Sequence, residues 1–152
     1  MNIALVHPML VHFPIVLVFV ALGLDLWALR ARATPVGGDF GPHAGTLMMV
    51  AAAVMALATF VFGLLAYDAA IASGVDEAIL EPHEGWGTTT TFVIVGIAAA
   101  RVLMWRRGLD RSRAGTGLAL AMCAVAVVLV VVTAGFGGDL VYDLGINVRH
   151  PA

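Results

Sequence analysis

The stretch HPMLVHFPI, residues 7–15, places two histidines and two prolines at the start of an apolar run that continues as VLVFVALGLDLWAL up to Arg30. A run of this length is enough to cross a hydrocarbon layer of ~30 Å as an α-helix. Pro14 lies inside the run and removes the hydrogen bond to the carbonyl of Leu10, so it either bends the helix beside His12 or is a tolerated strain. The sequence therefore predicts a transmembrane helix that opens with two imidazoles.

The composition of the whole chain places it in a membrane. Of its 152 residues, 61% are hydrophobic and only 12% are charged, which is more apolar surface than a soluble domain of this size can bury. The first apolar segment has no basic residue before it and no small-residue cleavage site after it, so we expect a retained span rather than a signal peptide. Four segments approach the ~20 residues that a spanning helix needs, at about 9–29, 44–66, 88–105 and 117–134.

These spans predict the fold class and the domain organisation. We expect one all-α domain over residues 1–152, an integral membrane four-helix bundle without a soluble module. The segment 135–152 is too short and too interrupted by glycine to span, so it should form a tail on or in the outer mouth of the bundle.

The arginines predict the orientation. By the positive-inside rule, the loops after the first and third spans are cytoplasmic, which puts both termini and a loop from about 67 to 87 on the outer face. The chain has no lysine, and the arginines of those two loops are Arg30, Arg32, Arg106, Arg107, Arg111 and Arg113. The outer face is acidic, so the chain lacks a basic surface for nucleic acid.

Two charges inside the spans lie at one predicted depth. Asp25 lies five residues before Arg30, and Arg101 lies five residues before Arg106, on helices that run parallel. Because an isolated charge in hydrocarbon is costly, we expect a structural ion pair between Asp25 and Arg101. The alternative is that both side chains extend to the nearby interface.

The same count brings three histidines to the outer end of the bundle. His7 and His83 each lie twenty-three residues from these reference arginines, and His12 lies about five residues deeper, which is ~7 Å along a helix. Imidazoles at a bundle mouth suit haem ligation, a transition metal site or a protonic switch. Haem fits best, because an apolar bundle offers a slot for the porphyrin and different helices can present imidazoles to the two faces of the iron.

The expected haem ligands are His12 and His83, with His7 as an alternative ligand or a neighbour of the site. The same three histidines would hold a non-haem metal instead, and the structural alternative for His12 is a neutral imidazole hydrogen-bonded inside the bundle. The aromatic side chains expected either to pack on a macrocycle or to form an interfacial belt are Phe13, Trp86 and Tyr142.

The remaining candidate residues indicate no other chemistry. His43, on the opposite membrane face, and His150 are interpreted as ordinary loop or terminal histidines, and Cys123 as a small packing residue. The sequence contains no nucleophile–base arrangement, no glycine-rich phosphate loop and no CxxCH haem-attachment motif. A hydrolase or nucleotide-dependent enzyme is therefore disfavoured.

Four motifs carry a family resemblance over nearly the whole chain. They are the opening HPMLVHFP, the FGLLAYD that ends the second span, a histidine at the start of the third, and the closing GGDLVYDLG. Together they resemble a bacterial family of small four-span membrane proteins catalogued as domain of unknown function 2231. The resemblance implies the same topology, and it implies that His7, His12 and His83 correspond to family histidines. Where the family often has a histidine before the last glycine of the closing motif, this chain has Leu144 before Gly145.

The function expected from these features is electron transfer rather than stand-alone enzymatic catalysis. Members resembling this family can accompany redox modules, so we expect a b-type cytochrome-like protein of the bacterial inner membrane. It would move electrons between a quinone or membrane partner and a periplasmic carrier. One alternative is a non-catalytic accessory subunit that packs on a larger membrane complex through the small-residue faces of the second and fourth spans. Others are a non-haem metal site and a metal or proton conduit.

Overall fold

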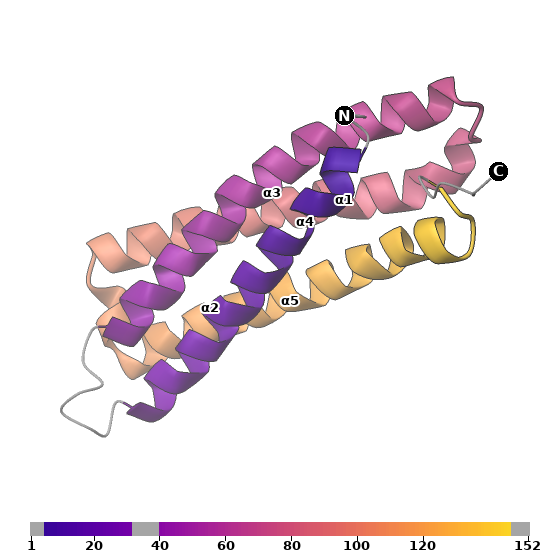
Figure 1. Ribbon diagram of the computed structural model, residues 1–152. Coiled ribbons are helices and arrows are strands. Elements are labelled where there is room, and N and C mark those ends of the chain that lie inside the picture. The colour runs from indigo at the N-terminus through magenta and orange to yellow at the C-terminus, as the bar shows by residue number, and fades with distance from the viewer. Residues whose placement is uncertain (1–4, 32–39, 147–152) are drawn as a thin grey trace.

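The structure, a computed structural model, describes residues 5–31 and 40–146, and this part of the chain is helical without strands (Figure 1). A short 3-10 helix, η2, lies between the last two long helices. The elements in chain order are α1 (Val6–Leu10), α2 (His12–Ala31), α3 (Phe40–Ala72), α4 (Glu77–Arg106), η2 (Leu109–Arg111) and α5 (Arg113–Tyr142).

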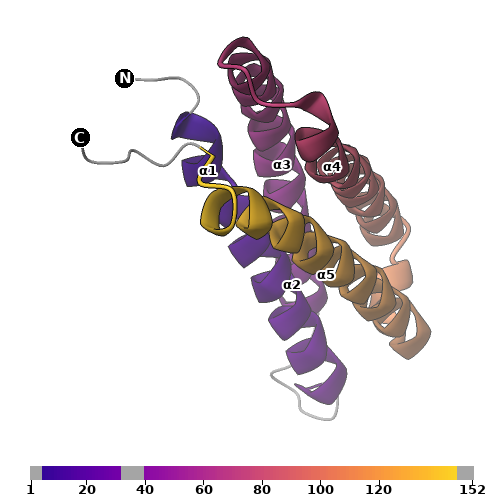
Figure 2. The ribbon, with the colours of Figure 1, turned by 90° about the vertical axis from the view of Figure 1, so that its right-hand side faces the viewer.

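The helices form an up-and-down bundle of four spans, in which α1 and α2 together make the first. Each span packs against the next along the chain, and α5 closes the bundle against α2 (Figure 2). The start of α1, the turn between α3 and α4 and the end of α5 lie at one end, and η2 lies at the other (Figure 1). All four spans are long and apolar enough to cross a membrane. The described part of the chain is therefore all-α, with four helices that could span a membrane.

The helices extend further than the apolar segments predict. α4 begins at Glu77 and α5 continues to Tyr142, so the expected outer loop shrinks to a turn at 73–76, and the expected tail from 135 is helical as far as 142. Hydropathy marks only the part inside hydrocarbon, whereas 30 residues of helix span ~45 Å. Polar residues continue the helices beyond the apolar segments, and at the start of α4 the carboxylate of Asp76 accepts a hydrogen bond from the backbone N–H of Ala78, 3.0 Å away.

Pro14 coincides with a break in the first span. α1 ends at Leu10 and α2 begins at His12, because the ring nitrogen of Pro14 cannot donate to the Leu10 carbonyl. The adjacent bond from Ile15 N–H to the Val11 carbonyl is stretched to 3.5 Å. The chain therefore enters the bundle as a separate short helix, which carries His7.

The core is built from small and medium apolar side chains that allow the helices to approach closely. At the centre of the core, each span contributes a side chain that is at most 1% exposed: Val18, Met49, Ile94 and Cys123.

The two halves of the bundle repeat one another. The first hairpin consists of α1, α2 and α3, and the second consists of α4 and α5. When the first helices are superimposed in sequence on His7 and His83, and the second helices on Thr59 and Thr133, many of the most deeply buried positions coincide. The coinciding pairs include Val18 with Ile94, Asp25 with Arg101, and Met49 with Cys123. The two hairpins therefore correspond in the order of their buried positions, as do the parallel repeats of some membrane proteins.

Candidate functional site

His7 projects from α1 onto α3. Its Nδ1 lies 3.0 Å from the backbone carbonyl oxygen of Thr59. One turn further along α3, the ring covers Gly63, where an added Cβ would lie 3.1 Å from both Cε1 and Nδ1 of the imidazole. The glycine therefore provides the space in which the Cε1–Nδ1 edge of the ring approaches α3.

His83 has the same environment in the second hairpin. Its Nδ1 lies 3.3 Å from the backbone carbonyl oxygen of Thr133 on α5. The ring covers Gly137, where an added Cβ would lie 2.9 Å from Cε1. Both helices carry the pattern Thr-x-x-Phe-Gly, at 59–63 and at 133–137. A single sequence motif thus forms two equivalent imidazole seats.

These hydrogen bonds fix the tautomer of both rings. A backbone carbonyl can only accept, so Nδ1 carries the proton in each neutral imidazole and Nε2 keeps its lone pair. Histidines that ligate metals are oriented in this way, with the distal ring nitrogen held by a carbonyl or carboxylate. The ring centroids of His7 and His83 are 6.1 Å apart, and the rings are inclined at 76° to each other.

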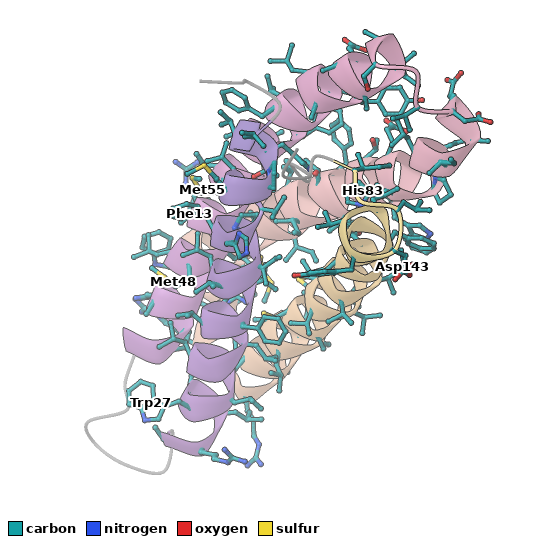
Figure 3. All side chains as sticks on the ribbon, turned by 45° about the vertical axis from the view of Figure 1, so that its right-hand side comes forward. Phe13, Trp27, Met48, Met55, His83 and Asp143 are labelled. Carbon is teal, nitrogen blue, oxygen red and sulfur yellow. The ribbon has the colours of Figure 1, made fainter. Side chains whose placement is uncertain are left out.

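The two imidazoles line a cavity of about 480 Å³ at the end of the bundle that holds the α3–α4 turn. Most of the lining is apolar and comes from every span, including Ile15, Phe60, Leu80, Ile94 and Val130. The last turns of α5 border it, close to the labelled His83 in Figure 3. The cavity, called the two-histidine cavity below, is therefore an apolar chamber that contains two oriented ring nitrogens.

An unsatisfied hydroxyl also lines this cavity. The side chain of Thr59 is only 8% exposed, and its Oγ1 has no hydrogen-bond partner among the described residues. Burying a hydroxyl without a partner is costly. A polar group of a bound molecule would remove this cost.

His12 lines the same cavity but is not part of the close pair. It is the first residue of α2, its side chain is exposed, and within residues 5–31 and 40–146 it has neither a hydrogen bond nor a ring contact. A separation of five residues rotates a side chain by roughly 140° around a helix. His12 therefore shares the depth range of His7 but not its direction.

The three predicted aromatic residues lie at the margin of the site or outside it. Phe13 is more than half exposed and points away from the bundle in Figure 3. Trp86 does not line the cavity, and it stacks on Phe136 with centroids 6.4 Å apart. Tyr142 borders the cavity but is 88% exposed. Their exposure is typical of an interfacial belt.

Asp25 and Arg101 form a bidentate ion pair in the core. Nη1 and Nη2 of Arg101 lie 2.5 and 2.7 Å from the two carboxylate oxygens, and Nε lies 3.4 Å from the hydroxyl of Thr46. An added Cβ at Gly45 would lie 2.8 Å from Nη2 of Arg101, so the pair rests directly on the backbone of α3. Neither charged side chain extends to the interface.

The opposite end of the bundle holds a polar contact that sequence reasoning missed. Nε2 of His43 lies 3.2 Å from Oδ2 of Asp110, which is almost fully buried, and the ring of Trp105 packs on the imidazole at 5.2 Å. His43 and Asp110 are far apart in the sequence, and their similar depth along the spans was the only sequence signal that could have indicated the contact. The contact joins the start of α3 to η2. His150 lies outside the described residues.

Comparison with known proteins supports the family resemblance. Neither the curated proteins nor the solved structures contain a match to this chain. The sequence model of the family described as "Predicted membrane protein (DUF2231)" matches residues 4–150. The resemblance seen in the four motifs is thereby confirmed, and the chain belongs to the DUF2231 family of predicted membrane proteins.

Proposed function

We propose that this protein binds one b-type haem in the two-histidine cavity, with His7 and His83 as axial ligands, and that it transfers electrons. The observation that carries the proposal is the paired geometry of these imidazoles. Each has its Nδ1 hydrogen-bonded to a carbonyl and its Nε2 available, and their centroids are 6.1 Å apart. Two imidazoles on opposite sides of one metal ion have centroids roughly 6 Å apart, because each metal–nitrogen bond is ~2 Å long.

The ligand count favours haem over a non-haem metal. A porphyrin supplies four nitrogens, so two protein ligands are enough, whereas a structural metal site usually needs three or four. Within the described residues, no three side chains of the types His, Cys, Asp and Glu gather closely enough to hold an ion. The apolar lining of the cavity suits a macrocycle.

Ligation by two imidazoles also favours a particular chemistry. Haem iron with both axial positions filled by protein exchanges electrons and has no open position for a substrate. We therefore favour an electron-transfer protein over an oxygen-activating enzyme. The ligand pair differs from the His12 and His83 expected from depth alone, and His12 becomes a neighbour at the edge of the cavity.

The setting of the proposed site follows from the charges at the two ends. The arginines Arg106, Arg107, Arg111 and Arg113 lie at the end remote from the cavity. The positive-inside rule would make that end cytoplasmic and the histidine end periplasmic, in the bacterial inner membrane. The electron partners would be a quinone or membrane subunit on one side and a periplasmic carrier on the other.

A visible spectrum tests the proposal. Protein purified from cells supplied with haem should show a Soret band that shifts on reduction, with one haem per chain. His7→Ala and His83→Ala should each lower the bound haem at least tenfold. His43→Ala is the matched control, because its imidazole lies at the other end of the bundle and should leave the pigment unchanged.

Two results would reject the haem proposal. One is the absence of a Soret band from folded protein that has also been titrated with hemin. The other is a haem content insensitive to both alanine variants. The function left would be that of an accessory subunit that packs on a larger complex, for which assembly would depend on the small-residue helix faces rather than on the histidines.

A further inference from the structure

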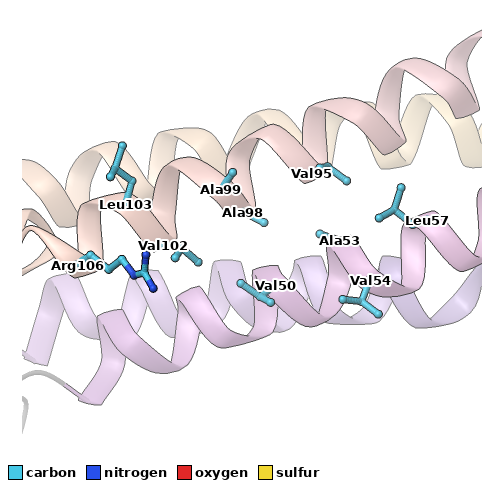
Figure 4. A pocket seen from close by; sticks show the side chains of 10 residues that line it. All are labelled: Val50, Ala53, Val54, Leu57, Val95, Ala98, Ala99, Val102, Leu103 and Arg106. Atoms are coloured by element: carbon cyan, nitrogen blue, oxygen red, sulfur yellow. The ribbon is translucent and has the colours of Figure 1, made fainter.

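A groove of about 450 Å³ runs between α3 and α4 on the outside of the bundle. It shares no lining residue with the two-histidine cavity. Figure 4 shows the apolar side chains of α3 and α4 that lie along it, with Ala98 and Val102 directed toward α3. Four residues come from α3 and six from α4. The lining residues are Val50, Ala53, Val54, Leu57, Val95, Ala98, Ala99, Val102, Leu103 and Arg106.

The length and position of the groove match one leaflet of a bilayer. On α4 it extends from Val95 to Arg106, the last residue of the helix. Eleven residues of helix cover ~16 Å, which is about half of a ~30 Å hydrocarbon core. The groove therefore starts near the middle of the membrane and ends at its surface.

Among the described residues that line the groove, the one charged side chain lies at its surface end. Figure 4 shows the guanidinium of Arg106 at the end of the apolar row, between α3 and α4. A guanidinium recognises phosphate through two parallel hydrogen bonds, and basic groups at the membrane surface favour anionic lipids. Arg107, the next residue, does not line the groove. An apolar slot with a cation at its mouth complements an acyl chain that carries a phosphate head.

We propose that this groove binds a single anionic phospholipid, with one acyl chain between α3 and α4 and its phosphate on Arg106. The site is independent of the proposed haem, since the two share no residue. It predicts a retained lipid in the leaflet at the arginine end of the bundle. The occupant is a phospholipid rather than a protein helix, because the groove combines an apolar lining with a single guanidinium at its surface end, which complements an acyl chain with a phosphate head.

Native mass spectrometry of the detergent-solubilised protein tests this site. Titration with phosphatidylglycerol should give one retained lipid per chain, and phosphatidylcholine should be retained more weakly. Arg106→Gln should weaken phosphatidylglycerol binding about fivefold. Arg107→Gln, the matched loss of charge one residue away, should leave it unchanged.

The apolar part of the groove is tested separately. Ala99→Phe fills the slot and should abolish the tight adduct. Gly96→Phe is its control, because Gly96 is exposed on α4, has open space around its Cβ position and does not line the groove. Circular dichroism of each variant verifies the fold. Equal loss from both arginine variants, or an unaffected adduct in folded Ala99→Phe protein, would overturn the proposal, because either result describes non-specific lipid at the surface.

Discussion

Arg101 donates two hydrogen bonds to the carboxylate of Asp25, at 2.5 and 2.7 Å, and the two side chains are 1% and 0% exposed. Each charge has been removed from water, so each depends on the other for compensation. The repeat places them at equivalent positions of the two hairpins, eighteen residues after His7 and His83 respectively. The pair therefore links the two halves of the bundle at its core.

Breaking this ion pair should destabilise the protein strongly. Asp25→Asn leaves the guanidinium buried without its counter-charge, and we expect a loss of ~3–5 kcal/mol in the free energy of unfolding. The measurement is unfolding in mixed micelles followed by circular dichroism. The double variant Asp25→Leu/Arg101→Met removes both charges and should recover most of the loss. A single variant within about 1 kcal/mol of the native protein would contradict a tight buried pair.

Gly137→Ala should displace the imidazole of His83. The added Cβ would lie 2.9 Å from Cε1, so the ring must leave its seat on α5. We expect haem content to fall severalfold, while helix content stays native because alanine favours helix over glycine by about 1 kcal/mol. Gly135→Ala, on the same helix with nothing within 4 Å of its Cβ position, is the control. If both variants behave alike in the absorption spectrum, close packing on Gly137 has no role in the site.

Thr59→Val and Thr133→Val should separate ligand binding from stability. Among the described residues, the hydroxyl of Thr59 makes no hydrogen bond that valine would lose, so stability should not fall. Hemin affinity should fall by ~0.5–1.5 kcal/mol, because the variant removes a hydrogen bond to the bound molecule. The hydroxyl of Thr133 lies 2.7 Å from that of Thr90, so its loss should lower stability by ~1 kcal/mol. Hemin titration and thermal unfolding measure the two effects. An unchanged hemin affinity in Thr59→Val would show that the bound molecule does not use this hydroxyl.

Cysteine labelling should establish the orientation in the membrane. Cys123 is fully buried, so the native chain should react little with a maleimide. In intact spheroplasts, a membrane-impermeant maleimide should label Asp143→Cys, just after α5, and spare Gly108→Cys in the opposite turn. Labelling of both sites after lysis is the control for access. The reverse pattern in intact spheroplasts would place the histidine end in the cytoplasm.

Depth along the spans could be predicted well from the sequence, because the arginines mark where two parallel helices leave the hydrocarbon. This reference brought Asp25 and Arg101 to one level, and the structure joins them directly. The four spans were predictable because each contains an apolar segment close to the ~20 residues that a spanning helix needs. The helix ends were not, since hydropathy carries no information about α-helix that continues in water, as in α4 before residue 88.

The direction in which a side chain points around its helix was harder to predict from the sequence than its depth along the helix. The choice between His7 and His12 depends on rotation about the first span and on the break at Val11, and counting residues fixes neither. The signal that identifies the seats is the repeated Thr-x-x-Phe-Gly pattern at 59–63 and 133–137, which becomes informative once the histidines are known to lie on it. The contact of His43 with Asp110 depends on how η2 folds back, which no local pattern encodes.

The repeated hairpins suggest how such a pocket arises. A chain half as long, with its own histidine, threonine and glycine in these positions, would enclose the same chamber by pairing with an identical copy of itself. Such a symmetric pair could not contain the ion pair of Asp25 and Arg101, because the symmetry axis of two identical chains would bring two like charges together. Fusing both halves into one polypeptide allows opposite charges at equivalent sites, and so commits each half to the other.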